Sequence, residues 1–171
     1  MSGEFDLIAR HWWHTVPSSS GVVLGNGDDC ALLAPAPGMA LATSTDMLVA
    51  GRHFLPDVDP EALGHKALAV NLSDLAAMGA RPLAFTLALA LPRVDEAWLA
   101  ALARGMLALA DAHGCALVGG DTTAGPLTLS VTVYGEVPPA QAFRRSAARV
   151  GDDVWVSGTV GDARLGLAVL L

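Results

Sequence analysis

The chain has little positive charge, few aromatic residues and few cysteines. Its 171 residues include 10 Lys and Arg against 17 Asp and Glu, for a formal net charge of −7. Nucleic-acid binding needs a basic surface, so this composition predicts no nucleic-acid partner. A phosphate ligand would need metal ions between its own oxygens and the carboxylates of the chain.

The sequence also lacks a recognisable targeting or membrane segment. The N-terminus, Met1 to Asp6, has neither the basic start nor the apolar stretch of a signal peptide. The longest apolar run, Leu83 to Leu91, has nine residues and is too short to cross a bilayer. Cys30 and Cys115 are far apart and show no metal-ligand spacing. We therefore expect a cytoplasmic protein with reduced thiols and no membrane partner.

Standard nucleotide-binding motifs are missing as well. The sequence contains no Gly-x-x-x-x-Gly-Lys-Ser/Thr, and Gly25-x-Gly27-x-x-Cys30 departs from the dinucleotide pattern at its last position. If the protein binds ATP, it does so by a route other than a P-loop.

The pattern of apolar residues predicts an α/β fold. Hydrophobic residues make up 53% of the chain and charged residues 16%, as in a well-packed globular protein. Helical spacing and capping residues predict helices over residues 4–15, 60–78 and 95–113 and from 161 onward. Apolar runs and alternation predict strands over residues 22–24, 29–33, 39–46, 83–91, 117–118, 127–137 and 154–156. Large and small side chains alternate along 83–91, which indicates a strand covered on both faces.

Aspartates occur in four short segments that are otherwise apolar or rich in glycine. These segments are Gly25-Asn26-Gly27-Asp28-Asp29, Ser44-Thr45-Asp46, Asn71-Leu72-Ser73-Asp74 and Gly119-Gly120-Asp121. Each segment alone could be an ordinary turn or helix cap. Together they favour a site for Mg²⁺, because hard oxygen ligands without a His or Cys cluster suit magnesium better than zinc.

The positions of these aspartates lead to specific expectations. Asp28 and Asp29 enter a strand, so their side chains should point to opposite faces and only one should face a metal. Asp46 should end its strand. Asp74 should lie on the apolar stripe of a helix, where a carboxylate is costly unless it is paired or metal-bound. The two glycines before Asp121 should let the main chain approach a ligand.

Two further features leave alternatives open. Arg144, Arg145 and Arg149 form a local basic cluster that could reach phosphate or could simply be a solvated linker. His53 lies in a loop soon after Asp46 and could contact a substrate, although a single histidine in a loop is more often just exposed.

Together these motifs resemble the thiamine-monophosphate kinase family of the aminoimidazole-ribonucleotide synthetase superfamily. The segments that carry the resemblance are Gly27 to Ala31, Ser44 to Asp46, Gly51-x-His53-Phe54, Asn71 to Ala80 and Gly119 to Thr123. The resemblance implies a mixed sheet with helices on one face. It also implies a homodimer in which the two chains join through the strands of this sheet. It also implies phosphorylation of thiamine phosphate by ATP with several Mg²⁺ ions.

Residue roles follow from the same resemblance, position by position. The metal ligands implied are Asp29, Ser44, Thr45, Asp46, Asp74 and Asp121. Gly120, Asp121 and Arg145 are implied to bind ATP, and His53 to bind thiamine phosphate. Asp28 is expected to be a turn residue. Residues 1–148 would form an N-terminal ATP- and Mg²⁺-binding domain, and 149–171 the start of a C-terminal domain that is truncated here.

No residue is expected to act as a general base, because a phosphate acceptor is already mostly ionised at neutral pH. Two other functions stay open. The chain could belong to another ATP-using enzyme of the superfamily, such as a selenophosphate synthetase, or it could be a non-catalytic dimerisation module.

Overall fold

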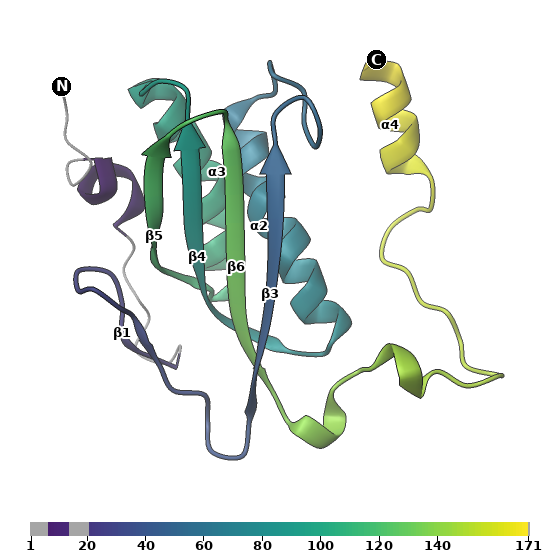
Figure 1. The fold of residues 1–171 in the computed structure, drawn as a ribbon. Helices are drawn as coiled ribbons and strands as arrows, with labels where there is room; N and C mark the ends of the chain where they lie inside the picture. Colours follow the sequence, from purple (N-terminus) through teal and green to yellow (C-terminus); the bar gives the residue numbers. More distant parts are fainter. Residues whose placement is uncertain (1–6, 14–20, 171) are drawn as a thin grey trace.

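A computed structural model of the chain describes residues 7–13 and 21–170. Its centre is a four-stranded sheet in the order β3 (Ala40–Val49), β6 (Thr128–Val137), β4 (Arg81–Leu91), β5 (Ala116–Ala124). The β3–β6 and β6–β4 pairs are antiparallel and the β4–β5 pair is parallel. Figure 1 shows two helices, α2 (Pro60–Ala77) and α3 (Glu96–His113), side by side on one face of this sheet. The expected mixed α/β fold is confirmed.

Both long helices begin where the sequence predicts. The Asp59 carboxylate accepts a hydrogen bond from the Ala62 amide, with Pro60 at the first helical position, and the Asp95 carboxylate accepts one from the Trp98 amide. The large side chains of β4 from Phe85 to Leu91 are buried against the helices, whereas Leu83 packs on the other side with Ala84, next to the register irregularity between Pro82 and Ala84. Within the described residues, no helix is long and apolar enough to span a membrane.

Smaller elements surround this body. A short π-helix, η1 (Ile8–Trp12), lies beside α3, and β1 (Val22–Leu24) pairs with β2 (Leu32–Leu33). Two 3₁₀ turns, η2 (Pro139–Gln141) and η3 (Arg145–Ala147), lead to α4 (Asp162–Leu170). Figure 1 shows α4 standing apart from the sheet.

Three sequence predictions about these smaller elements need correction or restriction. The helix predicted over 4–15 is confirmed over residues 8–12, as a π-helix; residues 4–6 and 14–15 lie outside the described part. The predicted strand at 154–156 is wrong: these residues form no strand and are exposed, because no neighbouring strand in the described part pairs with them. The strand predicted over 29–33 covers just Leu32 and Leu33, since residues 28–30 remain in the preceding loop.

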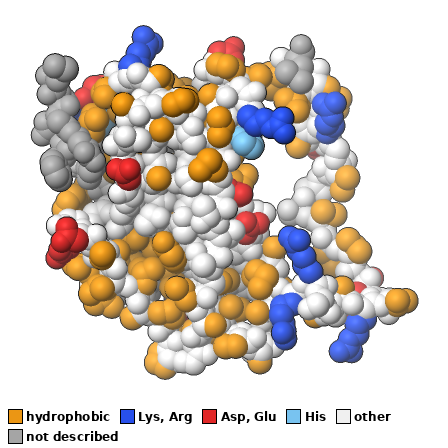
Figure 2. Space-filling view, in the orientation of Figure 1, with side chains coloured by type: hydrophobic (Ala, Val, Ile, Leu, Met, Phe, Trp, Pro, Cys, Tyr) orange, Lys and Arg blue, Asp and Glu red, His pale blue; other side chains and the backbone are white. Residues whose placement is uncertain are grey.

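The face of the sheet opposite the helices carries small and polar side chains. Thr45, Thr132 and Thr86 lie in one row across β3, β6 and β4. The small residues of β4 lie on this face, where β1 and β2 cover one end around Ala84 and Ala116. Figure 2 shows the rest of this face as largely uncharged, with acidic and basic groups mainly around its margin. Among the described residues no helix packs on this face. The second covering layer expected for β4 is therefore limited to the end that β1 and β2 cover.

Candidate nucleotide and metal site

A cavity of about 560 Å³ lies at the β5 edge of the sheet, between η1, the loop after β1 and the middle of β5. Its lining includes Asp28, Asp29, Gly120 and Asp121. Two of the four aspartate segments are therefore neighbours in space although they are far apart in the sequence. Asp28 and Asp29 both line this cavity. They lie in a turn instead of the expected strand, so the strand alternation that predicted opposite faces is absent.

Contacts with η1 hold the loop that carries these two aspartates. The Asn26 side-chain amide donates a hydrogen bond to the Trp12 carbonyl (3.1 Å), and the Asp28 carboxylate accepts one from the Asp29 amide (2.9 Å). Gly27 adopts φ of 120°, a conformation that favours glycine. The role of Asn26 was not predicted, because nothing local in the sequence indicates that η1 folds back onto this loop.

The two glycines before Asp121 differ in what they do. A Cβ atom on Gly120 would lie 1.8 Å from the Leu87 carbonyl oxygen, so close packing of β5 on β4 requires glycine there. A Cβ on Gly119 would meet just the Thr86 methyl group, at 3.8 Å. Asp121 lies inside β5, opposite Ala88, and does not follow a short strand as expected.

A second polar group lies at the opposite edge of the sheet, between β3 and α2. The Ser44 hydroxyl donates a hydrogen bond to the Asp74 carboxylate (2.5 Å), and the Asp46 amide donates one to the Asn71 side-chain oxygen (3.1 Å). Asn71 is completely buried and also donates to the Ala67 carbonyl (3.0 Å). Asn71 therefore fixes α2 against β3 and sets the position of Asp74 relative to Ser44.

Two expectations about this second group are wrong. Asp46 lies in the middle of β3 and does not end the strand, because the strand continues through the apolar residues up to Val49. Asp74 is exposed rather than buried on the apolar stripe of α2, because the helix turns this position toward Ser44 at the margin of its contact with the sheet. Its carboxylate therefore needs no metal to offset a burial cost.

The two groups are too far apart to share one metal ion. Asp46 is in register with Val131 on β6, which pairs with Leu87 on β4, which in turn pairs with Gly120 on β5. Three strand spacings separate them, roughly 14 Å. Accordingly, the described residues contain no set of three or more His, Cys, Asp or Glu side chains arranged to hold a metal ion.

The donor chemistry of each group nevertheless fits magnesium. Both groups offer carboxylate and hydroxyl oxygens, and Mg²⁺ is often bound by one or two carboxylates, with waters and substrate phosphates completing its shell. The carboxylates of Asp28, Asp29 and Asp121 at the cavity and that of Asp74 beside Ser44 are suitable partners. Neither group needs a complete cage of protein ligands.

His53 lies in the turn after β3, held by three hydrogen bonds, one of them from its amide to the Val49 carbonyl (2.9 Å). Its Nδ1 atom accepts from the Val49 amide (3.0 Å), and its carbonyl accepts from the Lys66 ammonium (2.6 Å). Because Nδ1 is an acceptor, the ring proton is on Nε2, which is then a donor. The contribution of Lys66 was not predicted, since it depends on α2 lying against this turn.

The remaining predicted residues lie elsewhere. The Thr45 hydroxyl pairs with that of Thr132 (2.9 Å) on the open face, away from Ser44 and Asp46. Arg145 is exposed in η3, and the Arg149 amide bonds to the Asp152 carboxylate in the following turn (2.7 Å). The structure does not bring the arginine cluster into the cavity lining.

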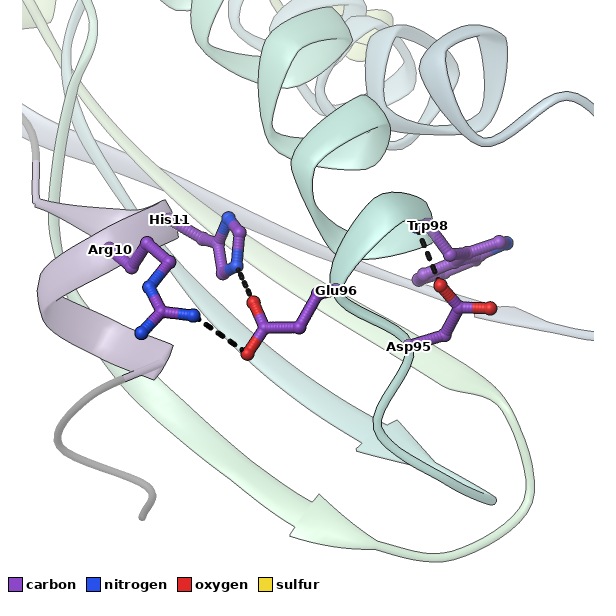
Figure 3. Close-up of polar contacts among 5 residues, drawn as sticks. All are labelled: Arg10, His11, Asp95, Glu96 and Trp98. Atoms are coloured by element: carbon purple, nitrogen blue, oxygen red, sulfur yellow. Dashed lines mark hydrogen bonds and ion pairs between the residues drawn. The ribbon is translucent and has the colours of Figure 1, made fainter. Parts of the chain in front are cut away.

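One further cluster attaches η1 to α3, and it gave no signal in the sequence. Figure 3 shows Arg10 and His11 of η1 both pointing at Glu96 in the first turn of α3. Arg10 bonds Glu96 at 2.9 Å and His11 Nε2 bonds it at 2.7 Å. The hydrogen bond from His11, followed by the charge and hydrogen bond of Arg10, keeps the pKa of Glu96 below its usual value. The wall of the cavity formed by η1 is thus tied to the helical layer.

Several known proteins resemble this chain. The thiamine-monophosphate kinases of Salmonella typhimurium and Escherichia coli K12 are each 54% identical over 168 residues, which is 98% of this chain and 52% of theirs. The chain thus spans about half the length of the curated relatives it matches.

Solved structures agree with the sequence matches. The crystal structure of thiamine-monophosphate kinase from Stenotrophomonas maltophilia K279a has a TM-score of 0.83 and 52% identity, covering 90% of this chain and 48% of that one. A structure described as AaThiL complexed with AMPPCP and TMP has a TM-score of 0.74 and 35% identity, covering 80% of this chain and 44% of that one. Residues 27–137 match the family described as AIR synthase related protein, N-terminal domain, and the chain therefore belongs to that family.

Proposed function

We propose that the protein containing this chain transfers a phosphoryl group from ATP to thiamine phosphate, giving thiamine diphosphate, and that this chain supplies the N-terminal part of the site. The observation that carries the proposal is the 54% identity to thiamine-monophosphate kinases across 98% of the chain. A relative described in complex with AMPPCP and TMP supports an ATP analogue and thiamine phosphate as the ligand pair. The acidic cavity beside Gly120 is compatible with a metal-bound nucleotide.

We assign the nucleotide and its magnesium to the cavity. Asp29 and Asp121 are the proposed metal ligands there, and Gly120 and Asp121 the proposed ATP contacts. Asp28 lines the same cavity, so we include it as a neighbouring acceptor for metal-bound water. Arg145 would reach the phosphates by movement of its segment, since it is exposed and outside the cavity lining.

The second group is assigned to further Mg²⁺ and to the acceptor. Ser44, Asp46 and Asp74 are the proposed ligands, and His53 would donate from Nε2 to a phosphate oxygen of thiamine phosphate. Because the side chain of Thr45 points to the open face, a metal contact of its hydroxyl would lie on that face, away from Ser44 and Asp46.

The chemistry required of these residues is charge neutralisation and alignment. An ionised phosphate acceptor needs no general base, so no side chain is assigned to remove a proton. Bound Mg²⁺ would screen the repulsion between two phosphate-bearing anions. The residues of the chain hold the two partners at fixed positions, Asn71 through α2 and Asn26 through the loop at residues 26–29.

We further propose a cytoplasmic homodimer that joins through the open face of the sheet. That face is largely uncharged in Figure 2 and includes Met47, which is 57% exposed. We divide the chain at residue 148, because residues 149–170 are exposed and α4 stands apart from the sheet in Figure 1. Residues 149–171 would begin a second domain.

Substitution of one aspartate in each group tests the proposal. In the whole enzyme, Asp121→Asn and Asp74→Asn should each lower the rate of thiamine diphosphate formation by about 100-fold or more, because an electrostatic contact to the transition state is lost. Circular dichroism and melting temperature should stay close to wild type, since both carboxylates are exposed. Asp153→Asn, an exposed aspartate outside both groups, is the matched control and should remain active.

Two results would contradict the proposal at different levels. Near-normal turnover of Asp121→Asn or Asp74→Asn would remove that residue from the metal site. A wild-type enzyme that hydrolyses or transfers from ATP but makes no thiamine diphosphate would rule out thiamine phosphate as the acceptor.

A further inference from the structure

Trp13 is a large exposed aromatic residue on the wall of the acidic cavity. It directly follows η1, and 61% of its surface is accessible to solvent. The outer edge of its indole ring lies about 3.3 Å from the position of a Cβ atom on Gly27, so the ring rests on the loop that carries Asp28 and Asp29. The rest of the ring is free to contact a molecule in the cavity.

The backbone on which Trp13 sits is held from two sides. Arg10 and His11 bond Glu96 of α3, as Figure 3 shows. Next to Trp13, the Trp12 side chain is buried in the core and its carbonyl accepts the bond from Asn26. The position of the indole ring is therefore set before any ligand arrives, which lowers the entropy cost of binding.

Gly119 is a second residue of the lining at which a flat group could approach the main chain. Its φ is ordinary and a Cβ atom there would meet just one methyl group at 3.8 Å, so neither backbone conformation nor sheet packing requires glycine. The residue lines the same cavity as Trp13. The absent side chain leaves bare main chain in the lining of the cavity that also includes Trp13.

The remaining lining includes both acidic and apolar residues. Asp28, Asp29 and Asp121 supply three carboxylates, and none of the described residues in the lining is Lys or Arg. Phosphate groups can therefore approach through bound cations. Leu87 and Leu117 line the cavity as well, and they suit an uncharged ring better than a phosphate.

We propose that Trp13 stacks on the base of the nucleoside triphosphate, with Gly119 leaving room for the ring, while the aspartates bind the metal that carries the phosphates. This inference rests on the proposed function, and it assigns recognition of the base to the side chain that directly follows η1. An aromatic residue can stack on any base, and the stacking adds roughly tenfold or more to affinity.

The test compares two ligands that share the phosphates and differ in the base. Calorimetry on the whole enzyme that contains this chain would measure the Kd of ATP and of inorganic tripolyphosphate, each with excess Mg²⁺. Trp13→Ala should weaken ATP by about tenfold and leave tripolyphosphate unchanged, and Trp13→Phe should recover most of the loss. Trp155→Ala removes an indole that is 88% exposed outside the cavity lining, and it should change neither Kd.

A second variant guards against misfolding of the first. Gly119→Ala should fold normally, because a Cβ atom there would meet just the Thr86 methyl group at 3.8 Å, and it should weaken ATP more than tripolyphosphate. An equal loss of both ligands in Trp13→Ala would overturn the inference, since Trp13 would then act by supporting the aspartate loop. Unchanged ATP binding in that variant would overturn it too.

Failure of the inference can be told apart from failure of the proposed function. A wild-type enzyme that binds ATP no more tightly than tripolyphosphate would refute base stacking but leave metal-dependent phosphate binding intact. A wild-type enzyme that binds neither ligand would refute both. If Trp13→Ala weakened thiamine phosphate and spared ATP, the ring would belong to the acceptor, and the inference would be wrong while phosphoryl transfer remained.

Discussion

Replacement of Gly64 by alanine should destabilise the protein, although alanine is the better helix former. Gly64 of α2 and Gly105 of α3 lie where the two helices touch through their backbones. A Cβ atom on Gly64 would be 2.0 Å from the Leu102 carbonyl oxygen, and one on Gly105 would be 1.9 Å from the Glu61 carbonyl oxygen. Ordinary contact begins near 3.4 Å, so α2 would have to move by about 1.4 Å.

The magnitude follows from two opposing effects. Helix propensity favours alanine over glycine by about 1 kcal/mol. Overpacking a close contact costs about 1–3 kcal/mol, and more when backbone atoms clash. The clash here involves the backbone of both helices, so we place its cost at the upper end of the overpacking range. After the gain in helix propensity is subtracted, the expected net loss of stability is about 2 kcal/mol. For a chain of this size that lowers the melting temperature by roughly 4–8 °C.

Urea denaturation followed by circular dichroism measures this change directly. Gly64→Ala should lower the midpoint without altering the slope, because the same surface is exposed on unfolding. The matched control is Gly166→Ala in α4, where a Cβ atom would meet nothing within 4 Å; it should leave the midpoint unchanged or slightly higher. A Gly64→Ala variant as stable as wild type would refute direct backbone contact between α2 and α3.

Two further predictions concern the contacts that hold the site. The pKa of Glu96 is lower in the folded protein than its usual value of 4.5. Its contacts therefore stabilise the protein at pH values above 4.5, and this stabilisation is lost as the pH falls through the pKa of the folded state. The stability of wild type should therefore exceed that of Glu96→Gln at neutral pH and converge with it in acid; a constant difference across the pH range would contradict the assignment. Lys66→Met removes the bond to the His53 carbonyl, worth about 1 kcal/mol, and should speed hydrogen exchange of the Val49 amide about fivefold. Unchanged exchange would mean that Lys66 does not hold this turn.

Sequence patterns predicted most of the long elements well because their signals are local, whereas β5 runs over Ala116–Ala124 and was predicted over just 117–118. The cap at Asp59 and the alternation through β6 are each contained in a few neighbouring residues, and both are confirmed. The strand predicted at 154–156 is wrong because an apolar run forms a strand only where a partner strand is present. Local composition carries no information about such a partner.

The candidate site was predicted in its residue types better than in its geometry. Two of the aspartate segments meet at one cavity, which agrees with the idea that the segments cooperate. The second pair of segments meets at the other edge of the sheet, which depends on strand order and could not be derived from spacing. Contacts such as Asn26 to Trp12 and Glu96 to His11 join residues from distant parts of the chain. They leave no periodic signal.

The separation of the two polar groups bears on how phosphoryl transfer could occur. Asp46 and Gly120 are about three strand spacings apart, roughly 14 Å, whereas the reacting atoms must approach to about 3–3.5 Å. If the cavity holds the nucleotide and the β3 edge holds the acceptor, the triphosphate must extend across the sheet or another surface must bring the two edges together. Asn71 and Asn26 fix each edge to the rigid body of the domain. Movement within this domain is therefore a poor way to close the distance. A second copy on the open face, or a following domain, could close it without distorting either group.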